Sequence, residues 1–361
     1  INTAYASSGL TGLGDEAVTL TDTSLTAATL NTLNANTTGT VDASTVTTIT
    51  GSVADANTMY ATAGITGGGD EAVTITDTTI TATALNTLDG NTTGTVDASS
   101  LKTITGTGAD AKTAFDSAGI TLTFDASSYL AGYTDLLAAF GTDLTSATSH
   151  YFANGVSEGR SFDAFDENSY LAGYSDLLAA FGTNTDSALV HYINNGYSEG
   201  RAADAFDENS YLASNTSLIG TVTDAAAHYV TTGYAAGLSL DTFDELSYLA
   251  SNSSLIGSTS VADATEHYVT TGYAAGLAAD SFDEYGYIAS HTDLIAAFGT
   301  NATAAAQHYI DFGSTEGRTV TFDASSYLAA HADLRAAFGT DQELAKQHYI
   351  NYGSDEGRTI A

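Results

Sequence analysis

Apolar residues alternate with threonine near the start of the chain, in two segments that match one another. Val18 and Leu20 are separated by one threonine, and so are Val73 and Ile75. A two-residue apolar period predicts a half-buried β-strand. A second short strand is predicted over residues 40–44, where the same alternation returns.

The spacing of leucine changes the prediction from strand to helix in the segments between. Residues 25–33 carry leucine at the first, sixth and ninth positions, which predicts a short helix that Thr23 or Ser24 caps. Residues 53–60 predict a second helix that ends near Gly64.

This pattern repeats with a period of 55, because residues 5–10 recur at 60–65 and again at 115–120. Each copy predicts the order β-α-β-α, and strands that return through helices pair in parallel. We therefore expect a β/α solenoid, whereas an antiparallel sandwich would leave the helical stretches unexplained. Residues 1–5 align with 56–60, so the chain begins inside the second helix of a repeat, and we expect another repeat before it.

The rest of the chain repeats a different phrase, F-D-x-x-x-Y-(L/I)-A…HY…G-x-x-x-G, with a period near 40 residues. Its six copies begin at Phe124, Phe165, Phe206, Phe243, Phe282 and Phe322. A period of this size predicts an array of helical units, each burying its apolar face against the next.

In the first of these copies, large apolar residues predict one face of a helix over 129–140, namely Tyr129, Tyr133, Leu136, Leu137 and Phe140. Ser127 or Ser128 is expected to cap this helix, and Gly141 to end it. A second helix is predicted over 146–154, ending at Gly155, with a connector behind it.

Each copy is then an αα-hairpin. The predicted fold is α/β plus all-α, with a Thr-rich β/α repeat domain over 1–121 and six helical hairpins over 122–361.

The six copies differ in a way that predicts ion pairs. Copies one, two, five and six carry an aspartate on the first helix and end in Glu-Gly-Arg, whereas copies three and four have Ser217 and Ser254 instead and end in leucine. Because a lone buried charge is costly, acid and base are expected to be lost together. The arginine is therefore predicted to pair with this aspartate or with the neighbouring glutamate. The predicted pairs are Asp135 with Arg160, Asp176 with Arg201, Asp293 with Arg318, and Asp333 with Arg358.

Two glycine-rich acidic loops are candidate calcium sites. Asp15 and Glu16 follow Gly12-Leu-Gly, and Asp70 and Glu71 follow three glycines. Carboxylate and backbone oxygens are the ligands that calcium takes in proteins. Solvated loop charges are the alternative, so calcium is a possible cofactor and none is certain.

Six histidines, each directly before a tyrosine, are spread at the 40-residue period. A metal site needs ligands close together, so we expect each histidine to form a hydrogen bond with a neighbouring hairpin.

Charge and composition narrow the class of protein. The formal net charge is −35, with 8 basic residues against 43 acidic ones, and such a surface repels nucleic acid and anionic lipid. No apolar run reaches the length of a membrane span, so we expect no membrane insertion. Cysteine is absent, so the chain has no disulfide and no thiolate metal site. The G-x-S-x-G, phosphate-loop and H-E-x-x-H motifs are absent too, so we expect no enzyme activity.

Copy two, from Phe165 through His191 to Arg201, resembles hairpin repeats of large secreted proteins of cyanobacteria and proteobacteria. The 55-residue block is similar to Thr-rich repeats in giant cell-surface or S-layer-like proteins of marine cyanobacteria. The resemblance implies type I secretion and a surface coat or appendage.

We therefore expect a non-enzymatic extracellular structural protein at the cell surface, a subunit of a self-assembling layer or filament. Repeat arrays with open ends favour head-to-tail or lattice contacts between copies. The alternative is an adhesin or calcium-dependent binding module of a larger secreted protein, with a cell-surface polysaccharide as a possible partner.

Overall fold

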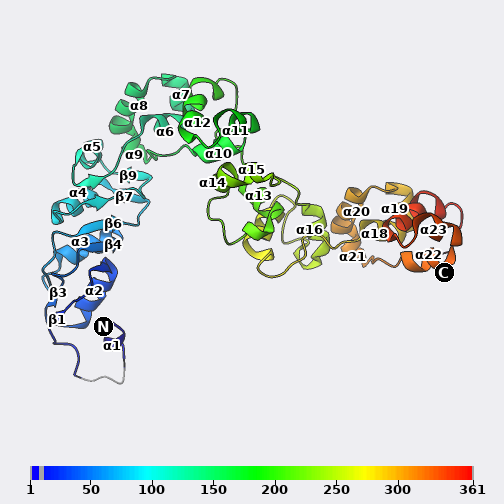
Figure 1. The fold of residues 1–361 in the computed structure, drawn as a ribbon, viewed down its shortest axis with the longest axis horizontal. Helices are drawn as coiled ribbons and strands as arrows, with labels where there is room; N and C mark the ends of the chain where they lie inside the picture. The colour runs from blue at the N-terminus through cyan, green and yellow to red at the C-terminus, as the bar shows by residue number, and fades with distance from the viewer. Residues whose placement is uncertain (1, 8–11, 360–361) are drawn as a thin grey trace. The chain divides into compact units, whose positions relative to one another are not determined.

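The computed structural model describes residues 2–7 and 12–359 and is mixed α/β, with many helices and parallel sheets (Figure 1). It divides into two compact units, Ile1–Ala205 and Phe206–Ala361. The division falls between the second and third helical copies, hereafter repeats two and three. It does not fall at the change of repeat type near residue 121.

Parallel strands form three sheets in the first unit, as the sequence predicts. The largest has the order β10-β8-β6-β4-β2, and the others are β1-β3-β5 and β7-β9. The strands are β1 (Val18–Thr19), β2 (Ser24–Thr26), β3 (Val41–Asp42), β4 (Thr48–Gly51), β5 (Ile65–Thr66), β6 (Ala72–Ile75), β7 (Thr79–Thr81), β8 (Val96–Asp97), β9 (Thr103–Thr105) and β10 (Ile120–Thr121).

The register of the largest sheet advances by 24 residues per strand, because Ser24 pairs with Thr48 and Thr48 with Ala72. The 55-residue sequence period therefore contains two turns of chain, each with its own helix. Val41 and Ile49 are fully buried on β3 and β4, where their side chains lie beneath the helices.

One helix follows each pair of strands, and the successive helices pack side by side (Figure 1). They are α2 (Ala27–Asn36), α3 (Val53–Ala61), α4 (Ala82–Asn91) and α5 (Gly108–Asp116), preceded by α1 (Asn2–Tyr5). The cap of α2 is Thr26, whose hydroxyl accepts the N–H of Thr29. The predicted caps Thr23 and Ser24 were wrong, because the β2 strand takes the chain past them before the helix begins.

Each helical repeat is more broken than a simple hairpin. Repeat one contains α6 (Ala126–Ala131), α7 (Thr134–Phe140), α8 (Leu144–His150), a five-residue π-helical turn η1 (Tyr151–Gly155) and α9 (Val156–Glu158). Asp125 caps α6 in place of the predicted Ser127 or Ser128, and Gly141 ends α7 with a φ of +60°.

The predicted single helix over 129–140 was wrong, because the helix breaks at Gly132 and Tyr133. A Cβ on Gly132 would lie 2.5 Å from the Cβ of Ala164, in the segment that leads to repeat two. Tyr133 adopts an extended conformation there (φ −133°, ψ 109°), which starts α7 in a new direction.

Repeats two, five and six follow the same plan. Their elements are α10 (Glu167–Ala172), α11 (Ser175–Phe181), α12 (Thr185–His191) and η2 (Tyr192–Gly196); α18 (Glu284–Ala289), α19 (Thr292–Phe298), α20 (Ala302–His308), η7 (Tyr309–Gly313) and α21 (Ser314–Glu316); and α22 (Ala324–Ala330), α23 (Ala332–Phe338), α24 (Gln342–His348) and η8 (Tyr349–Gly353).

Repeats three and four shorten the middle helix to a single 3₁₀ turn. Their elements are α13 (Glu208–Ser214), η3 (Thr216–Leu218), α14 (Ala225–His228), η4 (Tyr229–Gly233) and α15 (Tyr234–Ala236); and α16 (Glu245–Ser251), η5 (Ser253–Leu255), α17 (Ala264–His267) and η6 (Tyr268–Gly272).

An aromatic cluster joins the β/α part of the first unit to repeat one. Phe115 on α5 contacts Phe124, Phe152 and Phe162 edge to face, with ring centroids 5.3–5.8 Å apart. The backbone N–H of Phe162 also donates to the carbonyl of Lys102 at 2.9 Å. The two kinds of repeat therefore share one core in this unit.

Candidate functional site

A buried tyrosine and a histidine share a hydrogen bond in every helical repeat. The tyrosine of the Tyr-Leu/Ile-Ala phrase meets Nδ1 of the histidine of the His-Tyr phrase at 2.8–3.0 Å. The pairs are Tyr129 with His150, Tyr170 with His191, Tyr211 with His228, Tyr248 with His267, Tyr287 with His308, and Tyr327 with His348. The predicted partner, a neighbouring hairpin, was wrong, because both residues belong to the same repeat.

A glycine one turn after each histidine makes room for the tyrosine. A Cβ on Gly196 would lie 2.2 Å from the hydroxyl of Tyr170, and the six equivalent distances are 2.0–2.5 Å. Gly155 was predicted to end a helix, but the helix runs through it as the π-helical turn η1. This glycine is needed for the close approach of the tyrosine.

Burial keeps the tyrosine hydroxyl protonated. It raises the pKa of Tyr170, Tyr287 and Tyr327 to about 12 in each case. It also lowers the pKa of His348, beside Tyr327. The tyrosine is thus a neutral partner in this hydrogen bond at pH 7, which suits a structural role.

The structure brings each predicted aspartate and arginine together. Arg160 donates to both carboxylate oxygens of Asp135 at 3.0 and 2.8 Å, and its Nε donates to Glu158 at 2.6 Å. The same three-residue cluster recurs at Asp176–Arg201–Glu199, Asp293–Arg318–Glu316 and Asp333–Arg358–Glu356.

These ion pairs are not buried, contrary to the reasoning that led to them. The side chain of Asp135 is 60% exposed and that of Arg160 is 21% exposed. The hydrogen bonds from Arg160 lower the pKa of Asp135. The arginine also lies over the ring of Tyr133, 4.7 Å from its centroid, so it stacks as well as pairs.

Repeats three and four use an asparagine in place of the ion pair. The Nδ2 of Asn215 donates to the carbonyls of Tyr211 and Ser239, at 2.7 and 2.8 Å. Asn252 forms the same two bonds in repeat four, with Tyr248 and Ala278. The asparagine stands where repeats one and two have Tyr133 and Tyr174, so a neutral bridge ties the repeat ends together there.

In each candidate calcium loop, the glutamate already accepts hydrogen bonds and the aspartate is exposed. Glu71 is buried and accepts hydrogen bonds from the Tyr60 hydroxyl at 3.0 Å and the Gly69 N–H at 2.8 Å. Glu16 is held in the same way by Tyr5 and Gly14, while Asp15 and Asp70 are exposed. Within residues 2–7 and 12–359, no group of three or more His, Asp or Glu could hold a metal ion. The glutamates therefore act as loop braces in this geometry.

A half-buried glutamate stands among other acids at the start of repeat two. Burial, together with Asp163, Asp166 and Asp125, raises the pKa of Glu167 to about 7. Lys102 forms an ion pair with Asp163 in this cluster.

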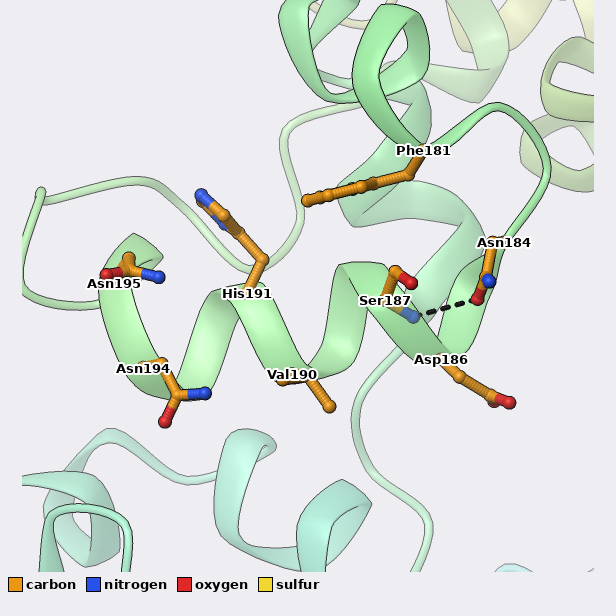
Figure 2. Close-up of a pocket in the computed structure, with 8 residues that line it drawn as sticks. All are labelled: Phe181, Asn184, Asp186, Ser187, Val190, His191, Asn194 and Asn195. Carbon is orange, nitrogen blue, oxygen red and sulfur yellow. Dashed lines mark hydrogen bonds between the residues drawn. The ribbon is translucent and has the colours of Figure 1, made fainter.

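A pocket of about 410 Å³ lies along α12 and η2 of repeat two (Figure 2). Phe181, at the end of α11, packs against His191, with ring centroids 5.7 Å apart, and both rings line the pocket. Val190, Asn194 and Asn195 complete the helix side.

Comparisons with protein-family models, with curated proteins and with solved structures found no match. Among the described residues, no helix is long and apolar enough to cross a membrane. The interpretation of function therefore depends on the chain's own geometry.

The sequence reasoning missed the Tyr–His–Gly arrangement and the Asn215 bridge. The first had a signal, because the Tyr-Leu/Ile-Ala, His-Tyr and glycine positions are filled in all six copies. The second had one too, since asparagine takes the Tyr133 position in the two copies that lack aspartate and arginine.

Proposed function

We propose that this chain is a non-enzymatic structural protein of the cell surface, a subunit of a self-assembling layer or filament. The observation that carries the proposal is the repetition itself. The same Tyr–His–Gly contact recurs in six repeats, and in each one the tyrosine hydroxyl and the histidine Nδ1 form a hydrogen bond that holds the repeat together. An enzyme needs one irregular site in such a scaffold. A regular series of repeats is suited to forming an elongated structural subunit.

Contacts between successive repeats support the same proposal. The hydroxyl of Ser251 accepts the N–H groups of Ser281 and Phe282 at the start of repeat five. Ser290 does the same for Thr321 and Phe322 at the start of repeat six. Since these serines bond the start of the following repeat, we propose that the helical array and the β/α turns both propagate as solenoids.

The charge and the composition fit an extracellular place. A net charge of −35 keeps free subunits apart in dilute salt, and screening in concentrated salt allows them to approach. Edge strands such as β2 present unpaired backbone groups to which a second chain could add.

Sedimentation velocity tests the proposal over a range of protein, salt and calcium concentrations. We expect the sedimentation coefficient to rise with protein concentration at high ionic strength, as chains associate. A monomer under every condition would refute self-assembly.

The second candidate function is an adhesin or binding module of a larger secreted protein. The pocket of repeat two favours it, because exposed polar and apolar side chains outside the Tyr–His–Gly contact, Val190, Asn194 and Asn195, line this pocket. A monomeric chain that binds a surface glycan would support this function over the first.

A further inference from the structure

We propose that the pocket of repeat two binds a neutral polysaccharide, with a sugar ring stacked on Phe181 and its hydroxyls bonded to Asn194, Asn195 and His191. This inference goes beyond self-assembly and does not depend on it, because a single monomeric chain contains the whole pocket.

The polar groups of the pocket are uncommitted. Asn194 and Asn195 are exposed, and within the described part of the chain neither side-chain amide has a hydrogen-bond partner. His191 uses Nδ1 for Tyr170, which fixes the ring and leaves Nε2 for a ligand. Amides both donate and accept, so two of them match the mixed donors and acceptors of vicinal hydroxyls.

The apolar part of the pocket suits one face of a sugar. Phe181 presents an aromatic ring, and Val190, which is 54% exposed, lines the pocket from α12. A pocket of about 410 Å³ lies within the roughly 300–1,000 Å³ of small-molecule sites, which combine apolar walls with a few polar groups. The C–H face of a pyranose would cover the ring while its edge reached the amides.

Repeats five and six keep the phenylalanine beside the histidine, but they replace one or both amides and add a second aromatic ring. Phe312 and Tyr352 replace Asn195 at the equivalent positions and are 56% and 60% exposed. Each lies 5.6 Å, centroid to centroid, from the histidine of its repeat, opposite Phe298 or Phe338.

Repeats three and four provide a natural comparison inside the chain. Their middle helix is the short 3₁₀ turn, so the phenylalanine is lost, and Thr232 and Thr271 stand at the Asn195 position. The arrangement is therefore confined to the repeats that carry the aspartate–arginine pair, whereas the Tyr–His–Gly contact is common to all six.

Charge selects a neutral ligand. The residues lining the pocket include Asp186 and no lysine or arginine. With a net charge of −35 over the chain, a sulfated or uronic polymer would be repelled.

The test measures hydrogen-exchange protection of residues 182–198 in the full chain, titrated with neutral gluco-, manno- and galacto-oligosaccharides and their polymers. Dextran sulfate is the anionic comparison. We expect saturable protection by at least one neutral series and none by dextran sulfate. In N194A/N195A we expect about 25-fold weaker binding at this segment, from two hydrogen bonds each worth about fivefold.

The matched control is T231A/T232A, at the equivalent positions of repeat three, which should leave binding at 182–198 unchanged. F181L, which keeps an apolar side chain, should also weaken it by removing the ring. Protection by no neutral series at millimolar concentrations, or equal affinity in N194A/N195A, would overturn the proposal. Assembly is followed separately by sedimentation, so either function can fail alone.

Discussion

Replacing Gly196 with alanine tests the Tyr–His–Gly contact most sharply. In an exposed helix, alanine is more favourable than glycine by about 1 kcal/mol. Here the new Cβ would lie 2.2 Å from the hydroxyl of Tyr170 and 3.2 Å from a ring carbon of Tyr192. The helix propensity alone would make G196A stabilising, whereas the close contact with Tyr170 makes it destabilising.

The magnitude follows from two costs and one gain. Overpacking a filled core costs about 1–3 kcal/mol. Moving the Tyr170 hydroxyl loses its hydrogen bond to His191, worth about 1 kcal/mol. After subtracting the propensity gain of about 1 kcal/mol, we expect G196A to destabilise repeat two by about 1–3 kcal/mol.

Two further variants make the result specific. Gly90 also lies in a helix, α4, and a Cβ added there would have no neighbouring atom within 4 Å, so G90A should be neutral or stabilising by up to about 1 kcal/mol. Y170F removes the clashing hydroxyl, so G196A combined with Y170F should cost less than the two single changes added.

The assay is native-state hydrogen exchange, which reports the opening free energy of repeat two separately from the rest of a repeat chain. If G196A left repeat two as stable as before, or if Y170F gave no rescue, the packing argument would be refuted.

Four other predictions concern the polar contacts. Urea denaturation of D135A, R160A and the double variant should give a coupling free energy between the two residues of about 0.5 kcal/mol, because the ion pair is exposed. Salt at 1 M should weaken this coupling. Purely additive losses of stability would contradict the pairing. N215A should lower the opening free energy of repeat three by about 1–3 kcal/mol, since two carbonyls lose their hydrogen-bond donor. The control N351A removes an exposed asparagine on η8 and should leave the stability unchanged. The pKa of Glu167 in the folded chain is raised to about 7, so the stability of the fold should fall as pH rises from the ordinary pKa of a glutamate to about 7. In a pH series of thermal melts, E167Q should remove this fall. A pH profile that E167Q leaves unchanged would contradict the prediction. The pH dependence expected from Asp135 has the opposite sign, because the pKa of Asp135 is lowered and its stabilising effect is lost in acid. A D135N chain that loses as much stability in acid as the parent chain would contradict this prediction.

Periodic features were predictable from the sequence, and local geometry was not. The alternation at Val73 and Ile75 correctly predicted a strand, β6, and parallel pairing followed from the helices between strands. The cap of α2 was misplaced because Ser24–Thr26 has no apolar alternation of its own to reveal the strand.

Steric contacts between distant residues explain the larger errors. Gly132 and Gly155 were treated as neutral or as stop signals, but Ala164 and Tyr129 come close to them only in the folded chain. The joint loss of aspartate and arginine in two repeats correctly predicted which residues form ion pairs. The exposure of these pairs could not be predicted from the sequence, because it depends on how the folded repeat packs.

Electron microscopy of the purified chain at rising ionic strength, with and without a calcium chelator, tests the proposed function most directly. Our account predicts ordered sheets or filaments with a spacing set by the repeats. It also predicts that chelation leaves them intact, because Glu16 and Glu71 are already bound by tyrosine and glycine donors. Dispersed single particles under every condition would contradict it.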